Sequence, residues 1–189
     1  MTPTSLVDSI ETPHSLSLCF ADVPIRVRTN DSDVCARLAS YFQPYVISAA
    51  PPAAEIRLIQ GSVPITGRFT DLIRPGGRRP KEATQEVEGG RLILKRATGV
   101  LMGLWPGGGF AAGDIRTNLN QGINLVNNCY AKVVLRRGHV LLHASAVSRK
   151  GRTAVLAGPP GAGKSTSAWR CSTDGASAPT GAWRRTISG

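Results

Sequence analysis

The chain has 189 residues, enough for one domain of about 150 residues or for two smaller ones. Its 41% share of hydrophobic residues and mean hydropathy of -0.07 argue against a disordered or membrane-embedded protein, and no apolar run approaches the roughly 18 residues of a membrane span. The net charge of +11 would suit nucleic acid, an anionic membrane or phosphorylated ligands, but the basic residues lie in small scattered groups without a basic helix, so nucleic-acid binding is the least favoured function.

The N-terminus and the cysteines bear on the cellular compartment. The stretch from Met1 to Glu11 carries acidic residues where a secretory signal would carry basic ones followed by an apolar run, so we expect a cytoplasmic protein with no membrane partner. The cysteines are too widely spaced for a metal-binding C-x-x-C pair, and we interpret them as reduced, mostly buried thiols. They are Cys19, Cys35, Cys129 and Cys171.

Alternation of apolar and polar residues predicts three strands in the first part of the chain. They cover residues 16–20, 25–28 and 55–59. With a helix between the second and third strands, this pattern predicts a small α+β region over residues 1–61.

That helix is predicted from its cap and from its apolar spacing. Asn30 or Asp31 can accept hydrogen bonds from the N–H groups of the first turn. Val34, Leu38 and Phe42 then follow at helical spacing and give the helix one apolar face.

Residues 62–90 are rich in Gly, Pro, Arg and Thr, a composition that predicts a flexible connection with at most a short strand at 69–73. Two apolar runs follow, at 91–96 and 100–105, with Thr-Gly between them. This arrangement predicts a β-hairpin.

A long amphipathic helix and a second hairpin are predicted next. The helix begins at Asn118 or Asn120, carries a broad apolar stripe and ends at Arg137, before a glycine. The extended runs 139–148 and 153–157 are joined by a short polar turn that contains glycine. The second strand of this hairpin leads directly into the most informative motif of the chain.

That motif satisfies every fixed position of the phosphate-binding pattern G-x-x-x-x-G-K-[ST]. Its glycines let successive backbone N–H groups converge on phosphate oxygens, and the helix that follows adds the positive end of its dipole. Lys164 would neutralise the β and γ phosphates of ATP, and the Ser165 hydroxyl would hold Mg²⁺. The predicted nucleotide-binding residues are Gly158, Pro159, Pro160, Gly161, Ala162, Gly163, Lys164, Ser165 and Thr166.

The residues after the motif show neither helical nor alternating periodicity. We expect residues 170–189 to be a disordered or frameshifted tail, with the native sequence ending near Trp169, so that 91–169 forms an incomplete kinase-like domain. Phosphoryl transfer needs a carboxylate for the metal ion and a group that orients the nucleophile. Asp174 is the only carboxylate after Lys164, and ten helical positions place it about 15 Å along the axis from the phosphates.

The segment Leu142-His143-Ala144-Ser145-Ala146-Val147, followed by a turn, an apolar strand and the loop, resembles the C-terminal domain of the HPr kinase/phosphorylase family. In that family a similar His-containing strand precedes the loop, at a distance that looks the same as the 21 positions from His143 to Lys164. The resemblance covers only about residues 137–169. It implies an α/β fold with a mixed sheet around the loop, as in phosphoenolpyruvate carboxykinase, preceded by the small α+β region.

The resemblance also implies an activity. Enzymes of this family use ATP and Mg²⁺ to phosphorylate a serine on a small carrier protein, and His143 matches the family histidine beside the active site. The acidic strand that supplies the family's catalytic Asp and a metal ligand has no counterpart here, so we expect this chain to hold ATP without transferring phosphate. A non-catalytic nucleotide-binding or assembly module stays open as an alternative function. The oligomeric state also stays open, and a homo-oligomer is one option.

Overall fold

The computed structural model describes residues 7–73 and 80–173. The chain divides into two compact units, Met1–His139 and Val140–Gly189. The predicted tail falls almost entirely on residues 174–189, which lie outside the described residues.

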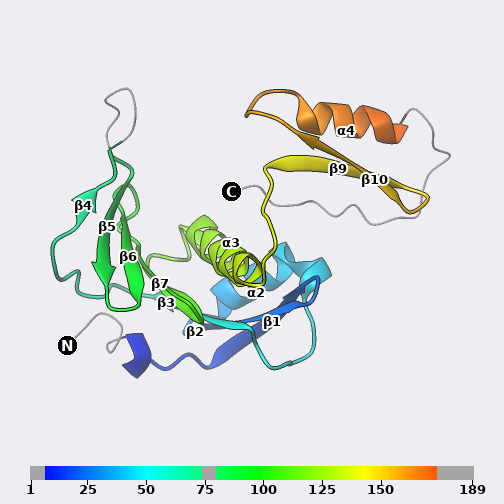
Figure 1. Ribbon diagram of the computed structural model, residues 1–189. Helices are drawn as coiled ribbons and strands as arrows, with labels where there is room; N and C mark the ends of the chain where they lie inside the picture. The colour runs from blue at the N-terminus through cyan, green and yellow to red at the C-terminus, as the bar shows by residue number, and fades with distance from the viewer. Residues whose placement is uncertain (1–6, 74–79, 174–189) are drawn as a thin grey trace. The chain divides into compact units, whose positions relative to one another are not determined.

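The first unit is built on an eight-stranded mixed sheet in the order β1-β2-β3-β8-β7-β6-β5-β4 (Figure 1). Strands β2, β3 and β8 run parallel to one another, and the remaining neighbours are antiparallel. The unit is therefore α/β, as predicted. The strands are β1 His14–Phe20, β2 Val23–Thr29, β3 Ala54–Gln60, β4 Thr70–Asp71, β5 Glu82–Val87, β6 Gly90–Lys95, β7 Leu101–Trp105 and β8 Gly108–Gly113.

Helices α2 (Ser32–Tyr41) and α3 (Leu119–Arg136) lie against one face of this sheet, over β1, β2, β3 and β8, and a 3-10 turn (Gln43–Tyr45) follows α2 (Figure 1). The alternation of the strands turns every second residue toward these helices. The resulting core takes in the predicted helix face of Val34, Leu38 and Phe42. The helices are thus held mainly by burial of apolar side chains.

The opposite face of the sheet is covered differently along its width. Beneath β3, β6, β7 and β8, a second apolar cluster gathers around Val7 from the N-terminal segment, with Ile59, Leu101 and Phe110. Beneath β1 and β2 the outward residues are polar and at most half-buried. The sheet therefore has one face under helices and one face that is only partly covered.

Close approach of β8 to β3 depends on Gly108. Its φ is +151°, and an added Cβ would lie 1.8 Å from the carbonyl oxygen of Glu55. Only glycine fits a backbone this close to its neighbour.

The boundaries of the units differ from those expected. Residues 1–61, 62–90 and the first part of 91–169 contribute to one mixed sheet in the first unit, whereas the described sheet that leads into the loop is the two-stranded pair β9 and β10. The stretch 62–90, expected as a flexible connection, contains β5, which pairs with the predicted strand β6. Its Ala83 is fully buried. The composition of β5 does not predict a strand, but hydrogen bonding to β6 along its length holds this segment in an extended conformation.

The described part of the second unit is a β-hairpin followed by a helix. The hairpin is β9 (Ala144–Arg149) and β10 (Arg152–Ala157), and the helix is α4 (Lys164–Thr173) (Figure 1). Strand β9 begins five residues later than the predicted run at His139. Helix α4 continues past Trp169, so the first residues of the expected tail, 170–173, are helical.

No helix within the described residues is long and apolar enough to cross a membrane. The described cysteines Cys19, Cys35 and Cys129 are free thiols, although only Cys129 is buried. Burial raises the pKa of the Cys129 thiol to about 12, which keeps it protonated and unreactive.

Candidate phosphate-binding loop

The hairpin delivers the chain into the loop at a defined position. Arg149 pairs with Arg152 and Ala144 with Ala157, and the turn between the strands is Lys150-Gly151, both with positive φ. Two-residue turns with positive φ match the twist of antiparallel strands, so they fix the register of the hairpin. The loop then begins at Gly158, immediately after the last paired residue.

The loop is a tight reversal between β10 and α4. The N–H of Ala162 donates to the Pro159 carbonyl at 3.2 Å, and the N–H of Ser167 donates to the Gly163 carbonyl at 2.9 Å. Gly161 and Gly163 have φ of +82° and +73°. Because L-residues rarely adopt this region, the glycine pattern of the sequence matches the conformation of the loop.

The side chain of Lys164 lies against the backbone of the loop. Its Nζ donates to the carbonyl oxygens of Gly158 and Pro159, each at 2.8 Å, and the residue is half-buried. Backbone carbonyls are weaker partners for an ammonium group than a phosphate oxyanion, whose bonds to it are charge-assisted on both sides. The amine is therefore held against the backbone of the loop by two neutral acceptors.

Ser165 and Thr166 lie in the first turn of α4 and are exposed. The first N–H groups of an α-helix have no partner within the helix and point along its axis, where its dipole is positive. The predicted phosphate-binding and metal-binding residues thus occupy one continuous segment, the loop after β10 and the start of α4. The three loop positions between the glycines, Pro159, Pro160 and Ala162, are exposed as well.

The charged residues of the segment 140–173 are all basic. Residues 140–173 contain Arg149, Lys150, Arg152, Lys164 and Arg170 but no Asp or Glu. Within the described parts of the chain no group of three His, Cys, Asp or Glu side chains could hold a metal ion. The side-chain oxygens within 158–166 are therefore the hydroxyls of Ser165 and Thr166, and Lys164 is the charged group of the loop.

His143 lies one residue before β9 and is exposed. The pairing of the hairpin ends at Ala144 and Ala157, so His143 precedes, and Gly158 follows, the last paired residues. The topology thus brings the sequence-predicted histidine and the loop to the same end of the hairpin. No hydrogen bond to the His143 side chain is seen among the described residues.

Helix α4 is attached to the hairpin through a small apolar contact. Ala168 is 7% exposed, whereas Trp169 and Val155 are 62% and 54% exposed. The described part of the second unit therefore buries little apolar surface of its own, in contrast to the two apolar clusters of the first unit.

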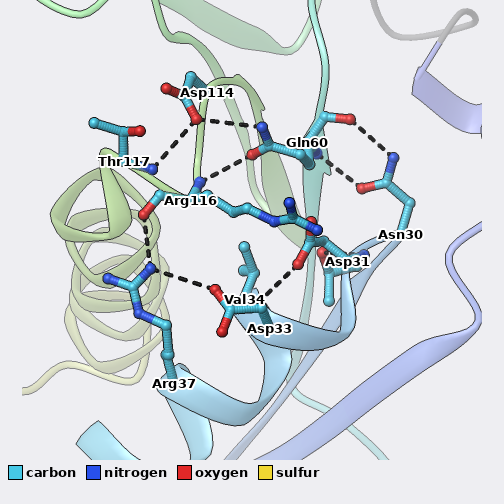
Figure 2. A network of polar contacts seen from close by, with 10 residues as sticks. Asn30, Asp31, Asp33, Val34, Arg37, Gln60, Asp114, Arg116 and Thr117 are labelled. Carbon is cyan, nitrogen blue, oxygen red and sulfur yellow. Dashed lines mark hydrogen bonds and ion pairs between the residues drawn. The ribbon is translucent and has the colours of Figure 1, made fainter.

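A second polar cluster, which the sequence did not point to, lies in the first unit at the carboxyl ends of the parallel strands β2, β3 and β8 (Figure 2). Gln60 is at its centre: it exchanges two hydrogen bonds with Asn30, and its side chain bonds the Asp114 carboxylate and the Arg116 N–H. In many open α/β sheets this edge holds a ligand.

Here the polar groups of that edge satisfy one another. Asp31, 5% exposed, caps α2 by accepting from the Val34 N–H at 3.0 Å and pairs with Arg116 Nε at 2.7 Å (Figure 2). Arg37 in turn donates to the Arg116 carbonyl at 2.8 Å. The cluster ties the starts of α2 and α3 to the sheet, which is a structural role.

The same contacts set the acidity of two carboxylates. Burial alone would raise the pKa of Asp31, but the hydrogen bond from Val34 and the charge of Arg116 outweigh it, so the pKa lies below its ordinary value. Hydrogen bonds from Thr117, and then from Gln60, lower the pKa of Asp114. Both groups stay ionised at neutral pH.

No family model, curated protein or solved structure matches the chain.

Proposed function

We propose that the segment 158–166 binds the β and γ phosphates of ATP together with Mg²⁺. The single observation that carries this is the position of Lys164, whose ammonium group is held against two loop carbonyls beside the start of α4. The absence of carboxylates in 140–173 supports the same conclusion, because an unopposed positive field favours a polyanionic ligand.

Each loop residue has a role in this proposal. Lys164 leaves the carbonyls of Gly158 and Pro159 and pairs with the phosphates. The N–H groups at the start of α4 donate to phosphate oxygens, and the Ser165 hydroxyl contributes to magnesium coordination. Mg²⁺ supplies charge neutralisation for the phosphate chain.

The resemblance to HPr-type kinases suggests the activity of a protein that combines this loop with catalytic carboxylates. We infer that it phosphorylates a serine on a small carrier protein, with His143 as a catalytic residue near the phosphate chain. The position of His143 next to the last paired residues of the hairpin, at the end from which the loop begins, supports this role. The free thiols of the described cysteines agree with the cytoplasmic, ATP-containing compartment that such an activity requires.

The 189-residue chain itself, in our proposal, binds ATP but does not transfer phosphate. Neither the loop nor the hairpin carries a carboxylate that could position the metal or accept a proton from the attacking hydroxyl. In this form the chain is a nucleotide-binding module.

Isothermal calorimetry with Mg-ATP tests the binding. Lys164→Ala is expected to weaken affinity by about tenfold to a hundredfold, the usual effect of losing a charge-assisted hydrogen bond. Lys150→Ala removes the same charge at the opposite end of the hairpin and serves as the matched control. Equal affinities for the two variants would contradict the proposal.

A transfer assay separates binding from catalysis. With radiolabelled ATP and a serine-containing carrier protein, the full chain is expected to leave the acceptor unlabelled. Labelling that His143→Ala abolishes would show that this chain is a competent kinase, and our account of its missing carboxylates would be wrong.

A further inference from the structure

A polar hollow of about 310 Å³ lies on the partly covered face of the first unit, under strands β1 and β2. It belongs to the opposite face from α2 and α3, because its strand residues alternate with the buried residues of the helix-covered core. Its lining residues are Thr12, Pro13, Ser15, Ser17, Arg26, Arg28 and Ala49.

Strand pairing builds this hollow from two matched pairs. Ser15 lies opposite Arg28, and Ser17 lies opposite Arg26. Because outward side chains repeat at every second residue, both guanidinium groups and both hydroxyls share one face. The hollow thus presents hydrogen-bond donors from two neighbouring strands.

The positive charge of the hollow is only partly balanced. Glu55 on β3 lies 3.7 Å from Arg26 and 3.8 Å from Arg28, distances too long for hydrogen bonds. Arg26 also donates to the Ala50 carbonyl at 3.1 Å. One carboxylate shared by two guanidinium groups leaves one net positive charge and unused donors.

Thr12 adds a buried hydroxyl at the wall of the hollow. The residue is 4% exposed, and its Oγ1 is buried without a hydrogen-bond partner among the described residues. A buried hydroxyl without a partner costs stability, and a hydrogen-bond acceptor or donor that enters the hollow would remove this cost. Thr12 is one of the residues that line the hollow.

We propose that this hollow binds the phosphate group of a small phosphorylated molecule. Guanidinium groups and hydroxyls are the donors that recognise phosphate oxygens, and the volume is at the lower end for small-molecule sites. Nucleic acid is a poorer fit, because the lining contains two arginines and no aromatic side chain on which a base could stack.

Backbone-amide NMR of the full chain, titrated with inorganic phosphate at constant ionic strength, tests the site. The titration uses a Lys164→Ala background so that the loop does not contribute. Amides of Ser15, Ser17 and Arg28 are expected to shift, and adding Arg28→Gln is expected to weaken the phosphate affinity by about tenfold. Arg91→Gln removes a comparably exposed arginine from β6 and is expected to leave the affinity unchanged.

Three results would overturn the proposal. One is the absence of shifts at the hollow, and another is an equal loss of affinity in the Arg28→Gln and Arg91→Gln variants. The third is a set of shifts caused by a DNA oligonucleotide but not by phosphate, which would make the face a nucleic-acid surface.

Thr12→Val provides a second test that does not depend on the arginines. The valine keeps the shape but lacks the hydroxyl, so it is expected to raise the unfolding midpoint in phosphate-free buffer and to reduce the gain that phosphate brings. A lower midpoint without phosphate, together with an unchanged phosphate effect, would contradict a role for this hydroxyl in binding.

Discussion

Among single residues, Asp31 has the clearest structural consequence. Its carboxylate caps α2, pairs with Arg116 and is almost completely buried. Asp31→Ala is expected to lower the free energy of unfolding by about 2 kcal/mol, since it removes a helix cap and leaves Arg116 without its partner.

Urea denaturation measures this loss. Asp33→Ala is the matched control, because Asp33 is exposed and makes a single 3.5 Å ion pair with Arg37 on the same helix. Its effect should stay within about 0.5 kcal/mol. A comparable loss of unfolding free energy in both variants would mean that the cap and ion pair of the buried Asp31 do not add to stability.

The lowered pKa of Asp31 also predicts a pH dependence. A carboxylate whose pKa is lower in the folded than in the unfolded state stabilises the fold above the unfolded value and loses that contribution as pH falls through the folded value. The free energy of unfolding should therefore fall as pH drops from about 5 through the ordinary value of 3.8 and below.

Substitution of the titrating group checks the assignment. Asp31→Asn should flatten the acid limb of the stability profile measured by urea denaturation at successive pH values, and Asp33→Asn should leave its slope unchanged. An unaltered slope in Asp31→Asn would assign the acid sensitivity to other carboxylates, such as Asp114.

At the scale of elements, the parallel pairing of β3 with β8 depends on the absence of a side chain at Gly108. Gly108→Ala is expected to destabilise the first unit by about 2 kcal/mol or more, because the new Cβ would overlap the Glu55 carbonyl in a strained backbone region. Thermal unfolding measures the shift. Gly107→Ala is the control, since its added Cβ would meet nothing within 4 Å.

The sequence predicted those helices and strands whose own residues show periodicity, a helix cap or turn residues. The strands near 25–28 and 91–96 form as expected, as does the helix whose cap was expected at Asn30 or Asp31. The hairpin before the loop also forms, with a first strand shorter than predicted. Each is specified by periodicity, a cap or turn chemistry within a few residues. The order of strand, turn and helix at 153–173 was predictable for the same reason, and nucleotide binding by this turn stays a prediction.

Elements that depend on distant partners were not predicted. Strand β8 is half glycine and β5 is largely polar, so neither shows a strand pattern. Both form because β3, β6 and β7 offer hydrogen-bonding edges from elsewhere in the chain. For the same reason the hollow around Arg26 and the cluster around Gln60 appear only once the strands are paired.

For the whole molecule, charge and burial are distributed unequally between the two units. Residues 140–189 carry seven of the 23 basic residues and one of the 12 acidic residues, while both apolar clusters belong to the first unit. The first unit is therefore the main source of folding stability, and the second combines a small framework with a concentrated positive charge. This division suits a nucleotide-binding segment joined to a stable scaffold.

Backbone-amide NMR of the full chain with Mg-ATP tests the central claim most directly. We expect large shifts at Gly161, Gly163, Lys164 and Ser165, whose N–H groups would donate to phosphate oxygens, and none in strands β7 and β8 of the first unit. The Lys164→Ala variant should lose most of this response. Saturating Mg-ATP that leaves those four amides unmoved would contradict the account.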